Sequence, residues 1–278
     1  MKSILRILLV SMAAACVLLA LFVPAAQVNA AARTASVSGP WSNTATWGGS
    51  SVPTSADDVT ISSGITVTVD TAAACASITF TAPAAAGGIT ISGTNSLTVS
   101  GPITMTAPTT AITCEIAVGA GTLTSGSIAI PAGGATNRIN KLSVSTGTIN
   151  INGDITFSGT ASRALLTFTD AGTLNLKGNL SVGGTLTAAT GTINCNGTSA
   201  QTLTGSTTAY VYNILKINNT AGVTLGRAVT ITTLNIGDQT PNSIFNDGGY
   251  AISTTSGTLN LLNNSTYNLG ASTATIWA

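Results

Sequence analysis

The stretch that decides the fold is residues 191–238, GTINCNGTSAQTLTGSTTAYVYNILKINNTAGVTLGRAVTITTLNIGD. Its short segments place apolar residues two positions apart, with Thr, Asn or Lys between them, as in Ile193/Cys195, Leu215/Ile217 and Val223/Leu225. This is the period of a strand with one buried face, and no helical period replaces it anywhere in the stretch. Gly, Asn and Ser/Thr clusters separate the segments and supply the turns. Between Ile231 and Leu234 the alternation slips by one residue, which predicts a corner rather than one long strand.

The same alternation continues upstream as far as Val59, and from Cys75 onward there is no domain break. The phrase Gly-Thr-Ile/Leu-Asn recurs at Gly147, Gly172, Gly191 and Gly257, and the span from the first copy to the last is a whole multiple of about 22 residues. A period of about 22 residues with irregular individual coils indicates a solenoid, whereas a β-sandwich lacks such a recurring phrase. We predict an all-β fold, a single-stranded parallel β-helix (β-solenoid) of roughly 22-residue coils, about 11 in number. A right hand is expected because parallel crossovers are right-handed.

The first 30 residues have the features of an export signal. Lys2 and Arg6 form a basic beginning, an apolar run from Ile7 to Val23 follows, and small residues precede Ala31. We predict a secretory signal peptide over residues 1–30, with cleavage after Ala30. A retained membrane anchor is the alternative, although an apolar run of about 17 residues is at the short limit for spanning a bilayer.

The rest of the chain is weakly charged. Two of the nine basic residues lie in the signal segment, so seven basic residues face eight acidic ones. This near-neutral balance predicts no partnership with nucleic acid and no membrane contact beyond export. Charged residues make up 6% of the chain, and solubility must therefore come from Thr, Ser, Asn and Gly. Disorder is excluded by a hydrophobic content of 44% arranged in regular alternation.

Three cysteines remain after the signal segment: Cys75, Cys114 and Cys195. None lies in a short metal-ligand spacing, and we expect no metal site and no cofactor. One alternative for an exported protein is a disulfide between Cys75 and Cys114. The other is that all three are small buried thiols within stacked rows.

Residues 31–70 hold two of the three tryptophans ahead of and beside the first clean strands. We expect this segment to form an N-terminal cap in which Trp41 and Trp47 shield the exposed first layer of strands, followed by the β-helix over residues 71–278. The functional alternative is that Trp41 and Trp47 form a platform on which a sugar ring stacks. Asp57 and Asp58 are expected to make a turn, because a calcium site needs more oxygen ligands than they supply.

The quoted stretch resembles the repeat unit of large bacterial secreted β-helix proteins of the surface-adhesin kind, and WSNTATWGGSSVPTSADDVTI, residues 41–61, is similar to the opening of such helices. The close resemblance covers residues 41–70 and 191–272. It implies a secreted or cell-surface location and carries over no catalytic residue. The repeats of such proteins run on where this chain stops, at Ala278, so the resemblance also implies a truncated chain or the front of a longer protein.

The absence of histidine excludes Ser-His triads, Cys-His pairs and imidazole metal sites. A carbohydrate-active β-helix enzyme would need close carboxylates. Asp154 and Asp170 are the candidates, because they are close enough in the sequence to approach each other on neighbouring coils. The simpler interpretation is that they are two unrelated turn residues.

Recurrent Thr-x-Thr pairs raise the possibility of an ice-binding array, but the irregular gaps between them argue against one flat face. We therefore expect a non-catalytic structural or adhesive surface protein whose partners are extracellular glycans or other cell-surface components. The alternatives are a β-helix enzyme acting on extracellular polysaccharide and a glycan-binding module.

Overall fold

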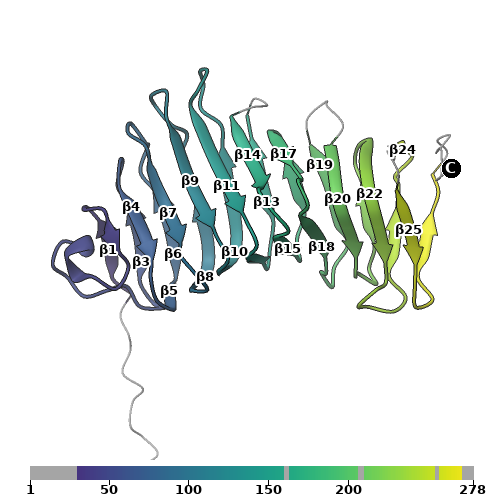
Figure 1. Cartoon of the computed structure of the whole chain (residues 1–278), viewed down its shortest axis with the longest axis horizontal. Coiled ribbons are helices and arrows are strands. Elements are labelled where there is room, and N and C mark those ends of the chain that lie inside the picture. Colours follow the sequence, from purple (N-terminus) through teal and green to yellow (C-terminus); the bar gives the residue numbers. More distant parts are fainter. Residues whose placement is uncertain (1–29, 160–162, 206–209, 254–256, 271–278) are drawn as a thin grey trace, which may run out of the picture. The chain divides into compact units, whose positions relative to one another are not determined.

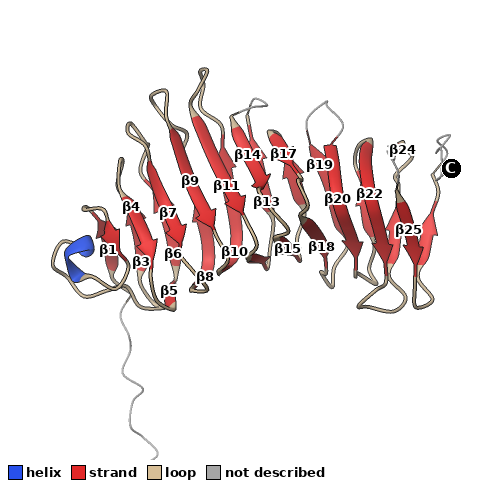
Figure 2. Cartoon of the chain, viewed as in Figure 1, coloured by secondary structure: helices blue, strands red, loops and turns tan. Residues whose placement is uncertain are grey.

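A computed structural model describes residues 30–159, 163–205, 210–253 and 257–270. The chain divides into two units, Met1–Ala30 and Ala31–Ala278, and everything below concerns the second. This unit is a stack of parallel β-coils, and Figures 1 and 2 show strands following one another with a single helical turn beside β1. The predicted all-β solenoid is confirmed. The predicted signal peptide, residues 1–30, lies outside the described residues except for Ala30. Over the described ranges, no helix is long and apolar enough to span a membrane.

Each coil contributes strands to three columns, and the strands of a column pair in parallel with their equivalents in adjacent coils. The first column contains β5 (Ala73–Cys75), the first halves of β8 (Ser96–Thr104) and β10 (Thr122–Pro131), β12 (Thr148–Ile151), β15 (Thr173–Leu176), β18 (Thr192–Cys195), the second halves of β20 (Tyr210–Ile217) and β22 (Val229–Ile236), and β25 (Thr258–Leu261). The second column contains β1 (Ala32–Ala35), β3 (Asp58–Ile61), β6 (Ser77–Phe80), the second halves of β8 and β10, β13 (Ile155–Ser158), β16 (Leu180–Val182), β19 (Gln201–Gly205), β21 (Val223–Leu225), β23 (Ile244–Asn246) and β26 (Thr266–Asn268).

The third column forms a separate sheet on another face of the coil. It consists of β2 (Gly39–Pro40), β4 (Thr66–Val69), β7 (Gly87–Ile91), β9 (Thr113–Val118), β11 (Ile139–Val144), β14 (Ala164–Phe168) and β17 (Thr185–Thr187). Nearer the C-terminus, the first halves of β20 and β22 and then β24 (Ile252–Ser253) pair with one another. Each coil is therefore a three-sided turn of chain around a shared interior.

The recurring Gly-Thr-Ile/Leu-Asn phrase marks one position in this stack. Ile149 pairs with Leu174, and Leu174 pairs with Ile193, so three copies of the phrase lie directly above one another in β12, β15 and β18. The fourth copy, in β25, lies in the same column two coils after β20. The repeat that was read from the sequence is thus the repeat of the coil.

Coil length varies more than the predicted period. Paired positions follow one another closely in the step from Leu174 to Ile193, whereas the step from Ile128 to Ile155 is much longer. The solenoid has about nine turns. The predicted number of about 11 is wrong, because several coils in the first two thirds of the unit carry longer turns between the same short strands.

The core consists of ladders of identical or similar apolar side chains. One ladder runs through the inward positions of the first column: Leu97, Leu123, Ile149, Leu174, Ile193, Leu215 and Leu234, each 0–3% exposed. Because strands in a sheet lie about 4.8 Å apart, each of these side chains packs on the one above and the one below. The inward positions of the strands are therefore filled by apolar side chains and not by charged ones.

The slip in alternation between Ile231 and Leu234 corresponds to a bend, but not to a break. β22 runs through the slip as one strand and pairs with β20 on both sides of it. The predicted corner is present, because the two halves of β22 belong to different columns, but the chain passes through it as one strand. Thr232 and Thr233 are both half-buried, and the inward-facing positions resume at Leu234.

The first coil carries the short 3₁₀ helix, Thr44–Trp47, which begins after Asn43. Trp41 and Trp47 are 1% and 3% exposed, and their rings meet edge to face with centroids 4.9 Å apart. The indole Nε1 of Trp47 donates to the carbonyl oxygen of Trp41 at 2.8 Å. This polar contact lets a large aromatic side chain be buried without an unpaired N–H group.

Asp57 closes a buried turn, as the sequence predicts, whereas the same prediction for Asp58 is wrong because Asp58 begins β3. The carboxylate of Asp57 accepts hydrogen bonds from the backbone N–H and hydroxyl of Thr54 and from the backbone N–H of Ala31, with Arg33 at 3.7 Å. The bond from the Thr54 backbone is the main reason that the pKa of Asp57 lies below its usual value, against the opposing effect of burial. Stabilisation from this carboxylate is therefore present at neutral pH and is lost as the pH falls through its lowered pKa.

We expect Leu174→Ala to lower the free energy of unfolding by about 2–5 kcal/mol, because the change leaves a cavity between Ile149 and Ile193. Urea denaturation followed by far-ultraviolet circular dichroism measures it. The matched control is Thr173→Ala on the outward side of the same strand, which should change stability by no more than about 0.5 kcal/mol. Equal effects at the two positions would contradict the assigned inward and outward faces.

Candidate functional site

The outward face of the first column carries two parallel rows of uncharged hydrogen-bonding side chains. Paired residues in successive coils define both rows, because the parallel register is kept from β8 to β25. One row contains Ser96, Thr122, Thr148, Thr173, Thr192, Ile214, Thr233 and Thr258. The other contains Thr98, Thr124, Asn150, Asn175, Asn194, Lys216, Asn235 and Asn260. We call these the threonine row and the amide row; Ile214 and Lys216 are the members that depart from this chemistry.

Neighbouring side chains in the amide row bond to one another. Asn175 donates from Nδ2 to Oδ1 of Asn150 at 2.9 Å, and Asn194 donates to Oδ1 of Asn175 at the same distance. Near the other end, Asn260 donates to Oδ1 of Asn235 at 2.7 Å. An amide has a donor and an acceptor on opposite sides, so identical amides stacked at the strand spacing can each satisfy the next.

A cluster of polar side chains lies at the coil corner beside Asn194 of the amide row. Asn218 donates from Nδ2 to Oδ1 of Asn194 at 2.9 Å and to Oδ1 of Asp238 at 2.8 Å, and its own Oδ1 accepts from the backbone N–H of Gln239. Nζ of Lys216 lies 2.7 Å from Oδ2 of the same Asp238. The cluster is internally paired, which indicates a structural role in fixing this corner.

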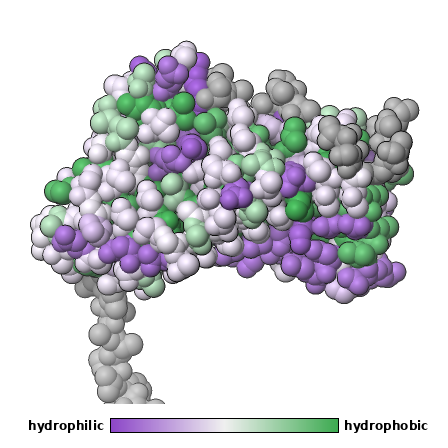
Figure 3. Space-filling model, in the orientation of Figure 1, coloured by the Kyte–Doolittle hydropathy of each residue, from purple (hydrophilic) through white to green (hydrophobic). Residues whose placement is uncertain are grey.

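The second column carries an outward row of mostly hydroxyl side chains with more exposure to solvent. Its members are Thr34, Thr60, Thr79, Thr104, Ala129, Thr156, Ser181 and Thr204. Four of these threonines are exposed: Thr34, Thr79, Thr104 and Thr156. We call the whole row of eight residues the exposed hydroxyl row; Ala129 is its member without a hydroxyl group. In one view of the molecular surface, residues of intermediate hydropathy cover much of the unit, and hydrophilic residues gather along its lower edge (Figure 3).

The Thr-x-Thr pairs do not gather on one face. Pairs that begin at Thr66, Thr167 and Thr185 lie in the third column, whereas those at Thr79, Thr104 and Thr202 lie in the second or start there. Another begins at Thr122 in the first column. This distribution agrees with the argument from sequence spacing against an ice-binding array built from such pairs.

The two carboxylates proposed for a glycosidase lie at different corners of the coil. Asp154 precedes β13 and accepts hydrogen bonds at Oδ1 from the backbone and side-chain nitrogens of Asn179, at 2.7 and 3.1 Å. Asp170 follows β14 and accepts from the backbone N–H of Ala171 at 2.8 Å. Two strands, β13 and β14, separate them along the coil, and the structure does not bring them together.

The tryptophans proposed as a sugar platform are not on the surface. A stacking platform needs an exposed ring face, and both Trp41 and Trp47 are buried against each other.

The three cysteines are free and buried. The disulfide between Cys75 and Cys114 is therefore wrong, and the interpretation as buried thiols in stacked rows is confirmed. Cys195, for example, stacks between Leu176 and Ile217. Burial raises the pKa of each thiol to about 12.

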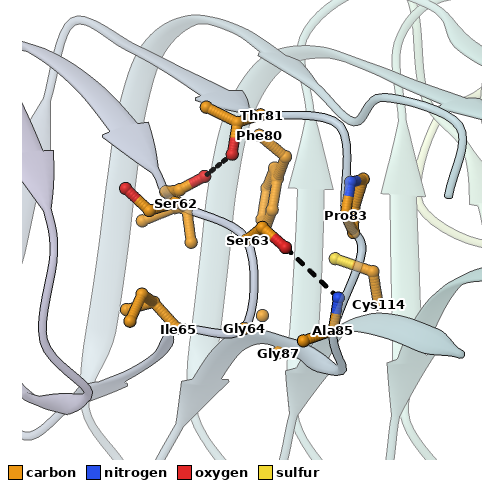
Figure 4. A pocket seen from close by; sticks show the side chains of 12 residues that line it. Ser62, Ser63, Gly64, Ile65, Phe80, Thr81, Pro83, Ala85, Gly87 and Cys114 are labelled. Carbon is orange, nitrogen blue, oxygen red and sulfur yellow. Dashed lines mark hydrogen bonds between the residues drawn. The ribbon is translucent and has the colours of Figure 1, made fainter. Parts of the chain in front are cut away.

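Cys114 also borders the small gap shown in Figure 4, between the turn at Ser62–Ile65 and the turn that follows Phe80. The hydroxyl oxygen of Ser63 accepts a hydrogen bond from the backbone N–H of Ala84 at 2.8 Å and one from that of Ala85 at 3.2 Å, and so ties the two turns together. The gap has no room for a water molecule, so it is a packing feature and not a ligand site.

Sequence reasoning missed a depression on the outer surface of the third column. It holds about 250 Å³ and is lined by Thr66, Ala86, Gly87, Gly88, Ile89, Thr90, Thr113, Glu115 and Ala117. The sequence signal was the dipeptide Gly87-Gly88, which is unsuited to a phosphate loop because no helix follows it. Among the described residues, no group of three or more His, Cys, Asp or Glu side chains could hold a metal ion.

Comparison of the chain with protein-family models, with curated proteins and with solved structures gave no match.

Asn194→Ala should lower the free energy of unfolding by about 1–3 kcal/mol, because it removes a hydrogen-bond partner from the half-buried amide of Asn175 and from the buried amide of Asn218. Asn260→Ala, near the end of the amide row, serves as the matched control and should cost less. Thermal unfolding of both variants gives the comparison. A larger loss at Asn260 would show that the row does not stabilise the stack as described.

The thiols should not react with a thiol-specific disulfide reagent at about pH 8 in the folded protein, because buried thiols with a pKa of about 12 remain protonated. After unfolding in guanidinium, all three should react. The measurement uses a chain with Cys16→Ser, so that only Cys75, Cys114 and Cys195 are counted. Rapid reaction of any thiol before unfolding would place that residue nearer the surface than the structure does.

Proposed function

We propose that this protein is a secreted, non-catalytic structural or adhesive element of a cell surface. Its exposed hydroxyl row and threonine row would lie against extracellular glycans or other surface components. The observation that carries the proposal is the parallel register, which repeats an outward threonine and an outward asparagine over three successive coils in β12, β15 and β18. The export-type N-terminus and the resemblance to adhesin β-helices support the location.

The chemistry of these rows suits weak, repeated contact. A threonine hydroxyl donates and accepts hydrogen bonds at modest net gain, so a single one gives little affinity. Rows of them at about 4.8 Å spacing present many equivalent contacts to an extended partner, and such contacts act together once the first has formed. Because few charges lie on these rows, binding should depend little on ionic strength.

The aromatic pair in the first coil fits this proposal as a cap. Trp41 and Trp47 are buried members of the hydrophobic core in the first coil, and in this proposal they shield the apolar side chains of the first layer. Shielding of a terminal layer is a requirement of solenoids that remain separate in solution.

The test is retention on insoluble cellulose, chitin and isolated bacterial cell walls. We expect Thr79→Ala, Thr104→Ala and Thr156→Ala, combined in one chain, to lower retention at least tenfold on the surface that the protein binds, equivalent to about 1.4 kcal/mol. The matched control is a chain with Thr167→Ala, Thr187→Ala and Thr230→Ala. These are outward positions of β14, β17 and the first half of β22, outside the exposed hydroxyl row, and this chain should bind as before.

Equal retention of the two variants would overturn the role of the exposed hydroxyl row. The non-catalytic part of the proposal is tested by release of soluble sugar from the same materials. Sugar release that disappears in Asp154→Asn or Asp170→Asn would replace it with a carbohydrate-active enzyme.

A further inference from the structure

The depression on the third column exists because one position in an outward row has no side chain. Thr66, Gly88, Glu115 and Lys141 occupy equivalent places in β4, β7, β9 and β11. Gly88 has a φ of +151°, and a Cβ atom there would come within 1.8 Å of the carbonyl oxygen of Glu115. A side chain is therefore excluded at this place. The result is a hollow between Thr66 and Glu115 in a sheet whose neighbouring outward positions carry side chains.

The carboxylate of Glu115 in the hollow is held in place by two side chains of the neighbouring strand β11. Its Oε1 lies 3.0 Å from Nζ of Lys141 and accepts a hydrogen bond from the hydroxyl of Ser143 at 2.5 Å. Both partners come from β11, the strand that follows β9 in the sheet. Because both engage Oε1, the second oxygen, Oε2, is left to accept a hydrogen bond from a bound molecule.

Hydroxyls and small apolar groups make up the rest of the lining. Thr66 and Thr90 are exposed and Thr113 is half-buried, so three hydroxyls surround the hollow. Ala86 and Ala117 contribute methyl groups beside the glycine backbone. The hollow thus combines several neutral donors and acceptors with a small apolar surface.

We propose that this hollow, which we call the Gly88 hollow, binds one neutral sugar ring. Lys141 compensates the charge of Glu115, so the site favours neither a free cation nor an anion. A volume of about 250 Å³ is just below the range for drug-sized ligands, and suits a single ring. A pyranose offers hydroxyls for Oε2 of Glu115 and for the threonines, and its C–H groups pack on the alanine methyls.

This site lies on a different column from the exposed hydroxyl row, and it concerns a small soluble ligand. Loss of surface adhesion and loss of sugar binding can therefore be observed separately. The expected affinity is in the millimolar range, since the hollow is shallow and offers no aromatic ring among its lining residues.

The experiment titrates the full chain, labelled with ¹⁵N, with glucose, galactose, mannose and N-acetylglucosamine, and follows the amide signals of Gly88, Thr90 and Glu115 by NMR. At least one sugar should shift these signals in a saturable way. Ala117→Phe places a ring in the hollow from an outward position and should abolish the shifts. Ala32→Phe, at an exposed outward alanine of β1 that belongs to none of the named rows, is the matched control and should leave them intact.

A second variant, Glu115→Gln, tests the carboxylate without changing its size. We expect it to weaken binding about tenfold, equivalent to about 1.4 kcal/mol. The proposal is overturned if none of the four sugars shifts the three signals. It is also overturned if the shifts persist in a folded Ala117→Phe protein, or if Glu115→Gln binds as tightly as the original chain.

Discussion

The parallel pairing of each strand with its equivalents one coil earlier and one coil later is the constraint on which the whole structure depends. It places identical positions about 4.8 Å apart, so any residue type that recurs at that position must tolerate its own kind as a neighbour. Aliphatic side chains do so inside, as in the ladder through Leu174. Threonine and asparagine do so outside, whereas a column of like charges would repel itself.

Asparagine shows how this constraint selects chemistry. In the amide row the Nδ2 groups of Asn175, Asn194 and Asn260 each donate to the Oδ1 atom of the asparagine one coil earlier. At Asn194 the row passes into the corner cluster with Asn218 and Asp238. The outward surface is therefore part of the stabilising framework as well as a surface for contact, and the two roles compete for the same polar atoms. The more exposed hydroxyl row of the second column has fewer such commitments.

Much of this architecture could be predicted because strand period and stacking both leave a local trace. The alternation around Leu215 and the recurring phrase at Gly147 are short-range patterns, and each identified its structural counterpart. The number of coils could not be predicted in the same way, because turn length does not alter strand period. The Gly88 hollow was also out of reach, since it depends on Thr66, Gly88 and Glu115 being brought into register across two coils of unequal length. The separation of Asp154 from Asp170 depends on which corner each occupies, which sequence distance does not reveal.

The variation in coil length, seen between the short step from Leu174 to Ile193 and the long one from Ile128 to Ile155, has a consequence for how such a molecule can change over evolutionary time. Residues added at a corner leave the strand register undisturbed, so the rims of the solenoid can diverge freely while its flat sides keep their character. A whole coil gained or lost by unequal recombination would lengthen or shorten every outward row by one member. Reach and valency could therefore be adjusted by copy number, without any new contact having to be invented.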